Sequence, residues 1–173
     1  GEVLLRRTDA RMIQSVTALL RQTGCELLEE QDAVLVRKTG KTGIIPDVKT
    51  AAYPGFPTDC QAIMTAALLR AEGESRIEET VFEDRFHHVP ELQKLGAKLE
   101  IHHNTVHISG VRTLSGAKLT ARDLRGGAAL VLAAMQAEGE SRVEGLTHID
   151  RGYERFAEKL RALGANIERC FDA

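Results

Sequence analysis

The feature that most constrains the fold of this chain is an internal repeat. The string AEGESRIE at Ala71–Glu78 recurs as AEGESRVE at Ala137–Glu144, 66 residues further along. Downstream of these copies, the string LQKLGAKLE recurs as LRALGANIE. A weaker copy of this second string, LLRQTGCELLE, lies near the N-terminus. A fixed period of this size indicates one duplicated supersecondary unit. We expect three related units, at about 1–44, 45–110 and 111–173, within a single domain spanning residues 1–173.

Each full unit carries two kinds of helix. Residues Ala62–Leu69 and Ala128–Met135 are apolar all round, which is typical of a helix buried on every side. Met12–Leu20 and Phe156–Leu163 instead carry apolar residues at helical spacing with polar residues between them, so these helices should keep one face in water. Equivalent glycines follow the helices and should end them in the left-handed conformation, namely Gly24, Gly96 and Gly164.

Short strands alternate with the helices, and the unit is predicted to be βαβαββ. The strand segments are Val3–Arg6, Ala33–Arg37, Ser75–Val81, Lys98–His102, Val106–Ser109, Lys118–Ala121, Arg142–Leu146 and Asn166–Cys170. The predicted class is α+β, built of α/β repeats, with buried central helices and small sheets outside. The first unit begins at its second strand and has no buried helix of its own, and the third ends without its last strand, so the chain looks cut at both ends.

The composition narrows the function classes. Lys and Arg number 23 against 25 Asp and Glu, a net charge of −2, so no general positive field attracts nucleic acid or an anionic membrane. Aromatic residues make up only 4%, which leaves few stacking platforms for single-stranded nucleic acid. The charge-free stretch Gly126–Ala137 is too short to cross a bilayer, and the N-terminal residues lack the order of a signal peptide. We expect a cytoplasmic protein that binds neither nucleic acid nor membrane.

Three cysteines, Cys25, Cys60 and Cys170, are odd in number and form no CxxC pair, so reduced thiols are expected. Cys60 opens an apolar helix and should be inert rather than nucleophilic. The histidines at 87, 88, 102, 103 and 107 lie close in sequence but lack acidic or cysteine partners at ligand spacing. We interpret them as surface histidines and expect no metal.

Chemistry-bearing residues gather in four segments that precede helix starts: YPGFPTD (53–59), TVFEDRFHHVPEL (80–92), ARDLRGGAALVLA (121–133) and HIDRGYERFAEKLRALGA (148–165). Asp59 stands just before a buried helix, where a carboxylate can cap free amides, and Arg125 occupies the same zone of the next unit. From the residues alone, a capping carboxylate and a salt-bridged arginine explain these two positions well.

Taken together, these strings resemble the UDP-N-acetylglucosamine 1-carboxyvinyltransferases. FPTD, FEDRF with HVPEL, DLR before a small apolar run, and HIDRGYE with KLRALGA occur in that family's order and spacing along essentially the whole chain. The resemblance implies two similar domains, each an inside-out α/β barrel of three βαβαββ units, with this chain as one domain corresponding to the C-terminal part. It also implies transfer of enolpyruvyl from phosphoenolpyruvate to the 3-hydroxyl of UDP-N-acetylglucosamine, the first committed step of peptidoglycan synthesis, without a cofactor.

The resemblance carries roles to individual residues. Asp59 matches the proposed general base for the sugar hydroxyl. Val81 and Phe82 match the segment that holds the N-acetylglucosamine portion, where Val81 can equally be a buried strand valine. Arg125 and Arg151 match arginines of the phosphoenolpyruvate site, where a forked guanidinium suits carboxylate and phosphate oxygens. The remaining matches are Asp123, near the tetrahedral intermediate, and Arg85, for which a structural ion pair is expected.

The family's reactive cysteine lies on a loop of the other domain, and no such motif occurs in this chain. The isolated chain is therefore expected to be inactive without its partner domain, and its bare apolar helix faces should favour self-association. Two alternatives stay open: enolpyruvyl transfer to shikimate 3-phosphate, and a non-catalytic binding module of the same fold.

Overall fold

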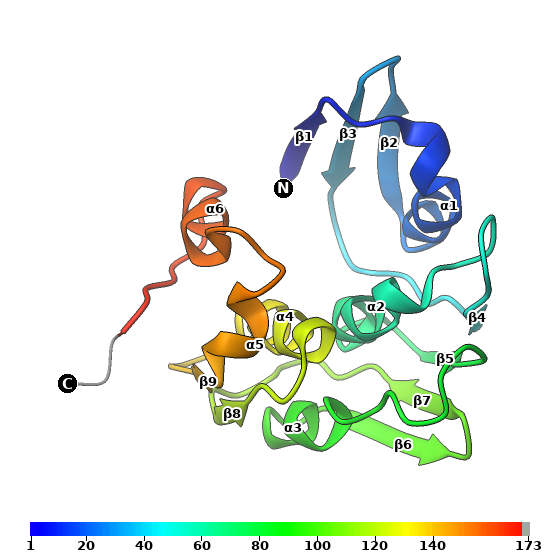
Figure 1. Ribbon diagram of the computed structural model, residues 1–173. Helices are drawn as coiled ribbons and strands as arrows, with labels where there is room; N and C mark the ends of the chain where they lie inside the picture. The colour runs from blue at the N-terminus through cyan, green and yellow to red at the C-terminus, as the bar shows by residue number, and fades with distance from the viewer. Residues whose placement is uncertain (171–173) are drawn as a thin grey trace.

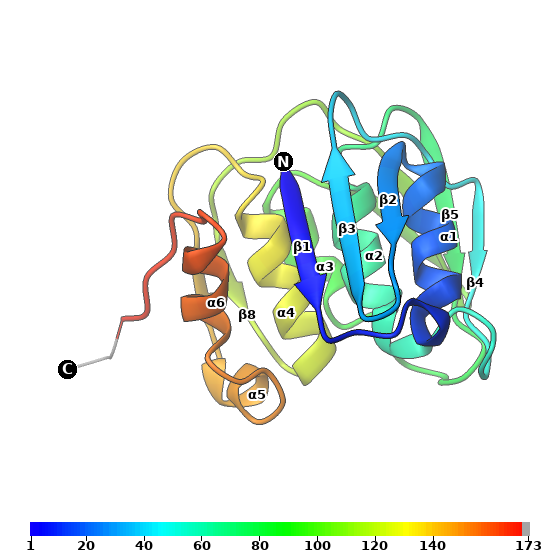
Figure 2. The ribbon, with the colours of Figure 1, turned by 90° about the horizontal axis from the view of Figure 1, so that it is seen from above.

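Two apolar helices lie side by side at the centre of the molecule (Figure 1). They are α2 (Gln61–Leu68) and α4 (Leu124–Ala134), and the computed structural model describes residues 1–170 around them. Most of their side chains are buried, including Ala66, Leu68 and Leu130. This confirms the prediction of two buried helices, and Figure 2 shows them beneath the N-terminal sheet.

The middle of the chain forms the predicted βαβαββ order. Its elements are β4 (Asp47–Lys49), η2 (Thr58–Cys60), α2, β5 (Glu74–Glu78), α3 (Val89–Lys94), β6 (Lys98–His102) and β7 (Thr105–Ser109). The sheet order is β4-β5-β7-β6, with β4 parallel to β5 and the other neighbours antiparallel. Ile77 of β5 stands opposite Val106 of β7, and both are fully buried beneath the helices. The strand β4 is only three residues long and was not predicted.

The two ends of the chain form partial versions of this order. The N-terminal elements are β1 (Glu2–Arg6), η1 (Ala10–Ile13), α1 (Gln14–Gln22), β2 (Cys25–Glu29) and β3 (Ala33–Lys38), with the antiparallel order β1-β3-β2. The C-terminal elements are β8 (Lys118–Thr120), α4, β9 (Arg142–Glu144), α5 (Leu146–Asp150) and α6 (Phe156–Ala162), with β8 parallel to β9. The chain is thus a mixed α/β structure with small sheets outside two central helices.

Several predicted boundaries need correction. Asn166–Cys170 is not a strand: a strand needs a hydrogen-bonding neighbour, and no described segment pairs with it. The strand predicted for Ser75–Val81 ends at Glu78, and Leu146 begins a helix instead of ending a strand. The glycine stops are confirmed, because Gly24, Gly96 and Gly164 have φ of 85°, 87° and 96°.

Along residues 1–170, no helix is both long enough and apolar enough to cross a membrane.

Candidate functional site

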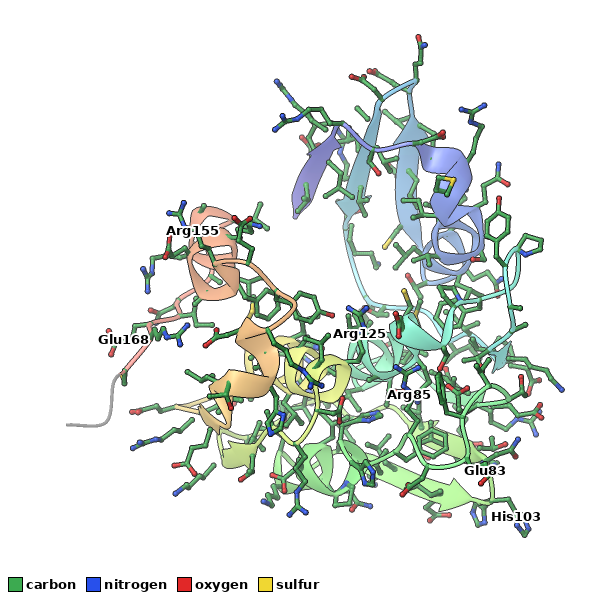
Figure 3. All side chains as sticks on the ribbon, in the orientation of Figure 1. Glu83, Arg85, His103, Arg125, Arg155 and Glu168 are labelled. Carbon is green, nitrogen blue, oxygen red and sulfur yellow. The ribbon has the colours of Figure 1, made fainter. Side chains whose placement is uncertain are left out.

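The candidate site lies where α2 and α4 begin. Asp59 stands in the short 3-10 helix η2, and its carboxylate is held by two arginines from other segments. Arg85 Nη2 donates to Asp59 Oδ1 at 2.9 Å, and Arg125 Nη2 donates to Asp59 Oδ2 at 2.8 Å. Figure 3 shows both arginines at the same end of α2. The Asp59 side chain is 51% exposed, so the cluster is open to solvent and to a ligand.

The capping role expected for Asp59 is wrong. The N-cap of α2 is Cys60, without a side-chain cap bond, because η2 extends the helix start and turns the Asp59 side chain toward the guanidinium groups. The capping carboxylate of this region belongs to Asp123 instead. Its Oδ1 accepts a bond of 2.7 Å from Gly126 N and so begins α4, which places Arg125 in the first turn of the helix, two residues after the cap.

The two guanidinium groups also set the protonation of the cluster. Hydrogen bonds from Arg125, and more weakly from Arg85, lower the pKa of Asp59, while partial burial opposes this change. Asp59 is therefore ionised at neutral pH and can accept a proton, although it is a weak base while both arginines hold it. Burial, with the charge of Asp59, raises the pKa of the neighbouring Cys60 thiol. A raised thiol pKa fits the inert role expected for Cys60.

Arg125 has a second partner that the sequence did not identify. Its Nη1 donates to Tyr153 Oη at 3.2 Å, and the guanidinium carbon lies 5.6 Å from the centre of the Tyr153 ring. The Tyr153 ring in turn contacts Phe156 at 4.9 Å between centroids. Tyr153 belongs to the string HIDRGYE, so the motif pointed to this region, but it carried no role for the tyrosine.

A buried carboxylate, Glu79, organises the other side of the site. It follows β5 directly and accepts hydrogen bonds from the amides of Val81 and Phe82. Val81 and Phe82 were predicted to hold the sugar, and these two residues are 46% and 53% exposed. The interpretation of Val81 as a buried strand valine is wrong, because the chain leaves the sheet after Glu78 and Glu79 pins the next residues in a loop. Sequence reasoning missed Glu79.

Of the two remaining candidate arginines, Arg151 lies outside this cluster and Arg85 lies within it. Arg151 is exposed at the end of α5 and, among the described residues, has no hydrogen-bond or ion-pair partner. Arg85, for which a structural ion pair was expected, does pair with a carboxylate, but that carboxylate is Asp59, so Arg85 belongs to the candidate site. The structure thus joins Asp59, Arg85 and Arg125, and leaves Arg151 free to meet a ligand.

One histidine contradicts the expected surface position. His88 is 3% exposed, and its Nε2 is buried without a partner in the described structure. Burial lowers the pKa of His88 to about 4, so the ring is neutral at pH 7. The rings of His102 and His107 meet edge to face at 4.9 Å, and His102 lies 3.3 Å from Glu100. Within residues 1–170, no three potential metal-ligating side chains gather in one place.

Comparisons with known proteins agree on one family. The family model described as EPSP synthase (3-phosphoshikimate 1-carboxyvinyltransferase) matches residues 1–160. UDP-N-acetylglucosamine 1-carboxyvinyltransferase 2 of Carboxydothermus hydrogenoformans is 49% identical over 99% of this chain and 41% of its own length. A UDP-N-acetylglucosamine 1-carboxyvinyltransferase of Salmonella paratyphi B is 50% identical over 98% of this chain and 40% of its own length. The chain therefore spans about 40% of these relatives.

Solved structures show the same architecture. The enolpyruvyl transferase NikO from Streptomyces tendae superposes with a TM-score of 0.81 at 28% identity, over 90% of this chain and 36% of that one. EPSP synthase from Acinetobacter baumannii superposes with a TM-score of 0.70 over 98% of this chain and 40% of that one. Because the EPSP synthase structure is only 16% identical to this chain, its similarity shows the fold alone.

Proposed function

The chain belongs to the EPSP synthase (3-phosphoshikimate 1-carboxyvinyltransferase) family, and on this basis we propose that it is one domain of a UDP-N-acetylglucosamine 1-carboxyvinyltransferase. The reaction is transfer of the enolpyruvyl group from phosphoenolpyruvate to the 3-hydroxyl of UDP-N-acetylglucosamine, in peptidoglycan synthesis. Relatives near 50% identity carry this name. They support the sugar nucleotide over shikimate 3-phosphate as acceptor, because the EPSP synthase structures are far more distant.

The observation that carries the proposal is the Asp59 carboxylate held between two guanidinium groups. An ionised carboxylate open to solvent can take the proton of a sugar hydroxyl, while forked guanidinium groups suit an anionic co-substrate. Asp59 and Arg125 stand at the starts of the two central helices, which are fixed by buried packing, and Arg85 reaches them from the loop before α3. This combination suits a hydroxyl acceptor and an anionic donor that meet at one point.

The repeat adds a second argument for the anion site. Counting one period of 66 residues, Asp59 corresponds to Arg125 and Arg85 corresponds to Arg151. In the middle unit this pair of positions holds an ion pair, Asp59 with Arg85. In the last unit both positions are cationic, Arg125 and Arg151. Among the described residues, the one carboxylate that pairs with either of them is Asp59, which contacts Arg125. A carboxylate or phosphate from outside, such as phosphoenolpyruvate, supplies the missing negative charge.

The proposed steps follow from this arrangement. Phosphoenolpyruvate binds Arg151 and draws Arg125 away from Asp59, which frees the carboxylate to accept the proton of the 3-hydroxyl. The sugar oxygen bonds to C2 of phosphoenolpyruvate while C3 gains a proton from an acid of the partner domain, giving a tetrahedral adduct beside Asp123. Loss of inorganic phosphate from C2 and of a proton from C3 restores the double bond in the product. The guanidinium groups offset negative charge on the adduct.

A partner domain completes the site in this proposal. The relatives are more than twice as long as the matched segment, and the resemblance assigns the reactive cysteine loop and further basic residues to the other domain. We infer that this chain is an inside-out barrel of βαβαββ units that meets that domain across the Asp59 end of α2. A cytoplasmic location fits these substrates.

The test uses a complete enzyme in which this chain replaces the matching segment of the Carboxydothermus relative. We expect phosphate release from phosphoenolpyruvate with UDP-N-acetylglucosamine as acceptor and none with shikimate 3-phosphate. Release with shikimate 3-phosphate alone would reassign the acceptor. Binding of both substrates without any phosphate release, while the unmodified relative is active, would instead indicate a non-catalytic binding module.

A further inference from the structure

Glu79 is a buried charge with no role in the steps above. It is 1% exposed, although it directly follows Glu78, the partly exposed last residue of β5. Its neighbour Glu78 points the other way and contacts Lys49 at 3.3 Å on the surface. A carboxylate removed from water is costly unless donors surround it, so its retention at this position requires a compensating arrangement.

Donors surround Glu79 on both oxygens. Oε1 accepts from Thr50 Oγ1 at 2.8 Å and from the amides of Val81 and Phe82 at 2.8 and 3.2 Å. Oε2 accepts from Thr58 Oγ1 at 2.7 Å. All four contacts are donors, which matches an ionised carboxylate, since that group only accepts. Burial alone would raise the pKa of Glu79, but the bonds from Thr58, Val81 and Thr50 outweigh it and lower the pKa.

The Thr58 hydroxyl links Glu79 to the candidate base. A hydroxyl has one proton, and Thr58 gives that proton to Glu79. Its lone pairs therefore face Arg85 Nη1, which donates to Thr58 Oγ1 at 2.5 Å. The same guanidinium donates from Nη2 to Asp59 at 2.9 Å. The orientation of Arg85 toward Asp59 thus depends on the acceptor at Glu79.

Arg85 also returns to the loop that Glu79 holds. Its guanidinium carbon lies 4.6 Å from the centre of the Phe82 ring. A continuous set of contacts therefore connects the candidate sugar loop to the candidate base. It runs from Glu79 to Thr58, from Thr58 to Arg85, from Arg85 to Phe82, and from Phe82 back to Glu79. Each residue in this set orients the next.

We propose that Glu79 is a positioning residue that fixes the sugar-binding loop at Val81–Phe82 and, through Thr58 and Arg85, the candidate base Asp59 in one geometry. The inference rests on the proposed function for its kinetic consequence and on the contacts above for its structural part. Glu79 touches neither substrate in this scheme. It sets the distance between the bound sugar and the base.

The main variant is Glu79→Gln in the complete enzyme, with Glu78→Gln, at the neighbouring residue that ends β5, as the matched control. The NH2 group of the glutamine amide must face either the Thr58 hydroxyl or the loop amides of Val81 and Phe82. All of these groups donate to Glu79, so the hydrogen bond on one side is lost. We expect kcat/KM for UDP-N-acetylglucosamine to fall roughly 10- to 100-fold, with the control within about twofold. Glu79→Gln at wild-type activity would overturn the proposal.

The pH profile separates positioning from general damage. Arg85 helps to keep the pKa of Asp59 low, so weakening that contact should move the acid limb of kcat/KM to higher pH. A merely structural loss would scale the rate equally at every pH and would count against the proposal. Thr58→Ser retains the hydroxyl and should keep activity, whereas Thr58→Val should reproduce the Glu79→Gln profile. The two Thr58 variants test the same proposal if Glu79→Gln does not fold.

A readout without catalysis distinguishes failure of this inference from failure of the proposed function. In the 173-residue chain, hydrogen exchange at the Val81 and Phe82 amides should be at least about tenfold faster in Glu79→Gln than in Glu78→Gln. Unchanged protection would overturn the positioning role even in an active enzyme. Lost protection in a protein that releases no phosphate would uphold the link and reject only the assigned reaction.

Discussion

Asp59 and Arg125 stand one repeat length apart, 66 residues, and their side chains meet at 2.8 Å. The duplicated position therefore carries opposite charges in the two units, and the ion pair joins the starts of α2 and α4. Because Arg125 is also held by Tyr153, one guanidinium connects the candidate base to the C-terminal segment. An anionic ligand that takes Arg125 competes directly with Asp59, which couples occupation of the anion site to release of the base.

The first prediction concerns Asp59. Asp59→Asn in the complete enzyme should reduce kcat by about 10²- to 10⁴-fold, since the amide still accepts a bond from an arginine but takes no proton. The thermal midpoint should change little, because the side chain is half-exposed and does not cap α2. Asp47→Asn, which removes an exposed partner of Arg76, is the matched control. Near-normal turnover in Asp59→Asn would leave this carboxylate with an ion-pair role only.

The second prediction concerns the anion site. Arg125→Ala and Arg151→Ala should each raise the KM for phosphoenolpyruvate more than the KM for the sugar nucleotide, because in the proposed function their forked donors bind the anionic substrate. Arg125→Ala should in addition raise the pKa of Asp59, whose largest lowering contact is Arg125. Steady-state kinetics at varied phosphoenolpyruvate measure the first effect. An unchanged saturation curve would remove these arginines from the site.

The sequence predicted the architecture better than the contacts. The apolar runs, the glycine stops and the period of 66 were sufficient for the central helices and the βαβαββ order, since burial and left-handed φ leave direct marks on sequence. Glu79 and Tyr153 left no such mark. Their roles depend on partners 21 to 29 residues away, and a single sequence does not show which distant side chains meet.

Local rules also misassigned two positions. Asp59 satisfied the capping pattern, but it lies in the 3-10 turn η2 and does not cap α2. The residue that does act as an N-cap is Asp123, at the start of α4. His88 follows another histidine in the string HHVP, yet α3 begins at the next residue and the His88 ring is buried. In both cases the deciding factor is a rotation of about one residue at a helix start, below the resolution of sequence patterns.

The third prediction uses His88. Its pKa is lowered by burial from 6.5 to about 4, with Asp123 raising it and His87 lowering it to smaller extents. Below pH 6.5 the unfolded chain binds a proton at His88, whereas the folded chain does not bind it until the pH reaches about 4. The free energy of unfolding therefore decreases as the pH is lowered from 6.5 to about 4. The full effect is about 3 kcal/mol.

His88→Phe keeps a buried ring without a titrating nitrogen, so its stability should fall less steeply than that of wild type between these two values. Urea unfolding at a series of pH values measures the slopes, with His103→Asn, at an exposed turn, controlling for the loss of one histidine. Parallel slopes for wild type and His88→Phe would show that His88 is protonated in the folded chain.

The fourth prediction is that the 173-residue chain alone releases no phosphate from phosphoenolpyruvate and UDP-N-acetylglucosamine. In the proposal, half of the closed site comes from the partner domain, and Arg125 stays on Asp59 until phosphoenolpyruvate is enclosed. Turnover above about one per second would show a complete site within this chain. The complete enzyme, assayed in parallel, serves as the positive control.

The last prediction concerns self-association of the isolated chain. Met135 at the end of α4 is exposed, Leu132 and Ile63 are partly exposed on the same helix pair, and β1 is an edge strand with its outer hydrogen-bonding groups unpaired by any described residue. Apolar helix surface and a free strand edge both favour association. We expect the weight-average mass in sedimentation to rise with concentration. Met135→Glu should weaken this association, whereas Leu163→Glu, at an even more exposed apolar position just after α6, should not. A concentration-independent monomer would mean that α1 and the N-terminal sheet already cover the helix pair well enough for a stable single chain.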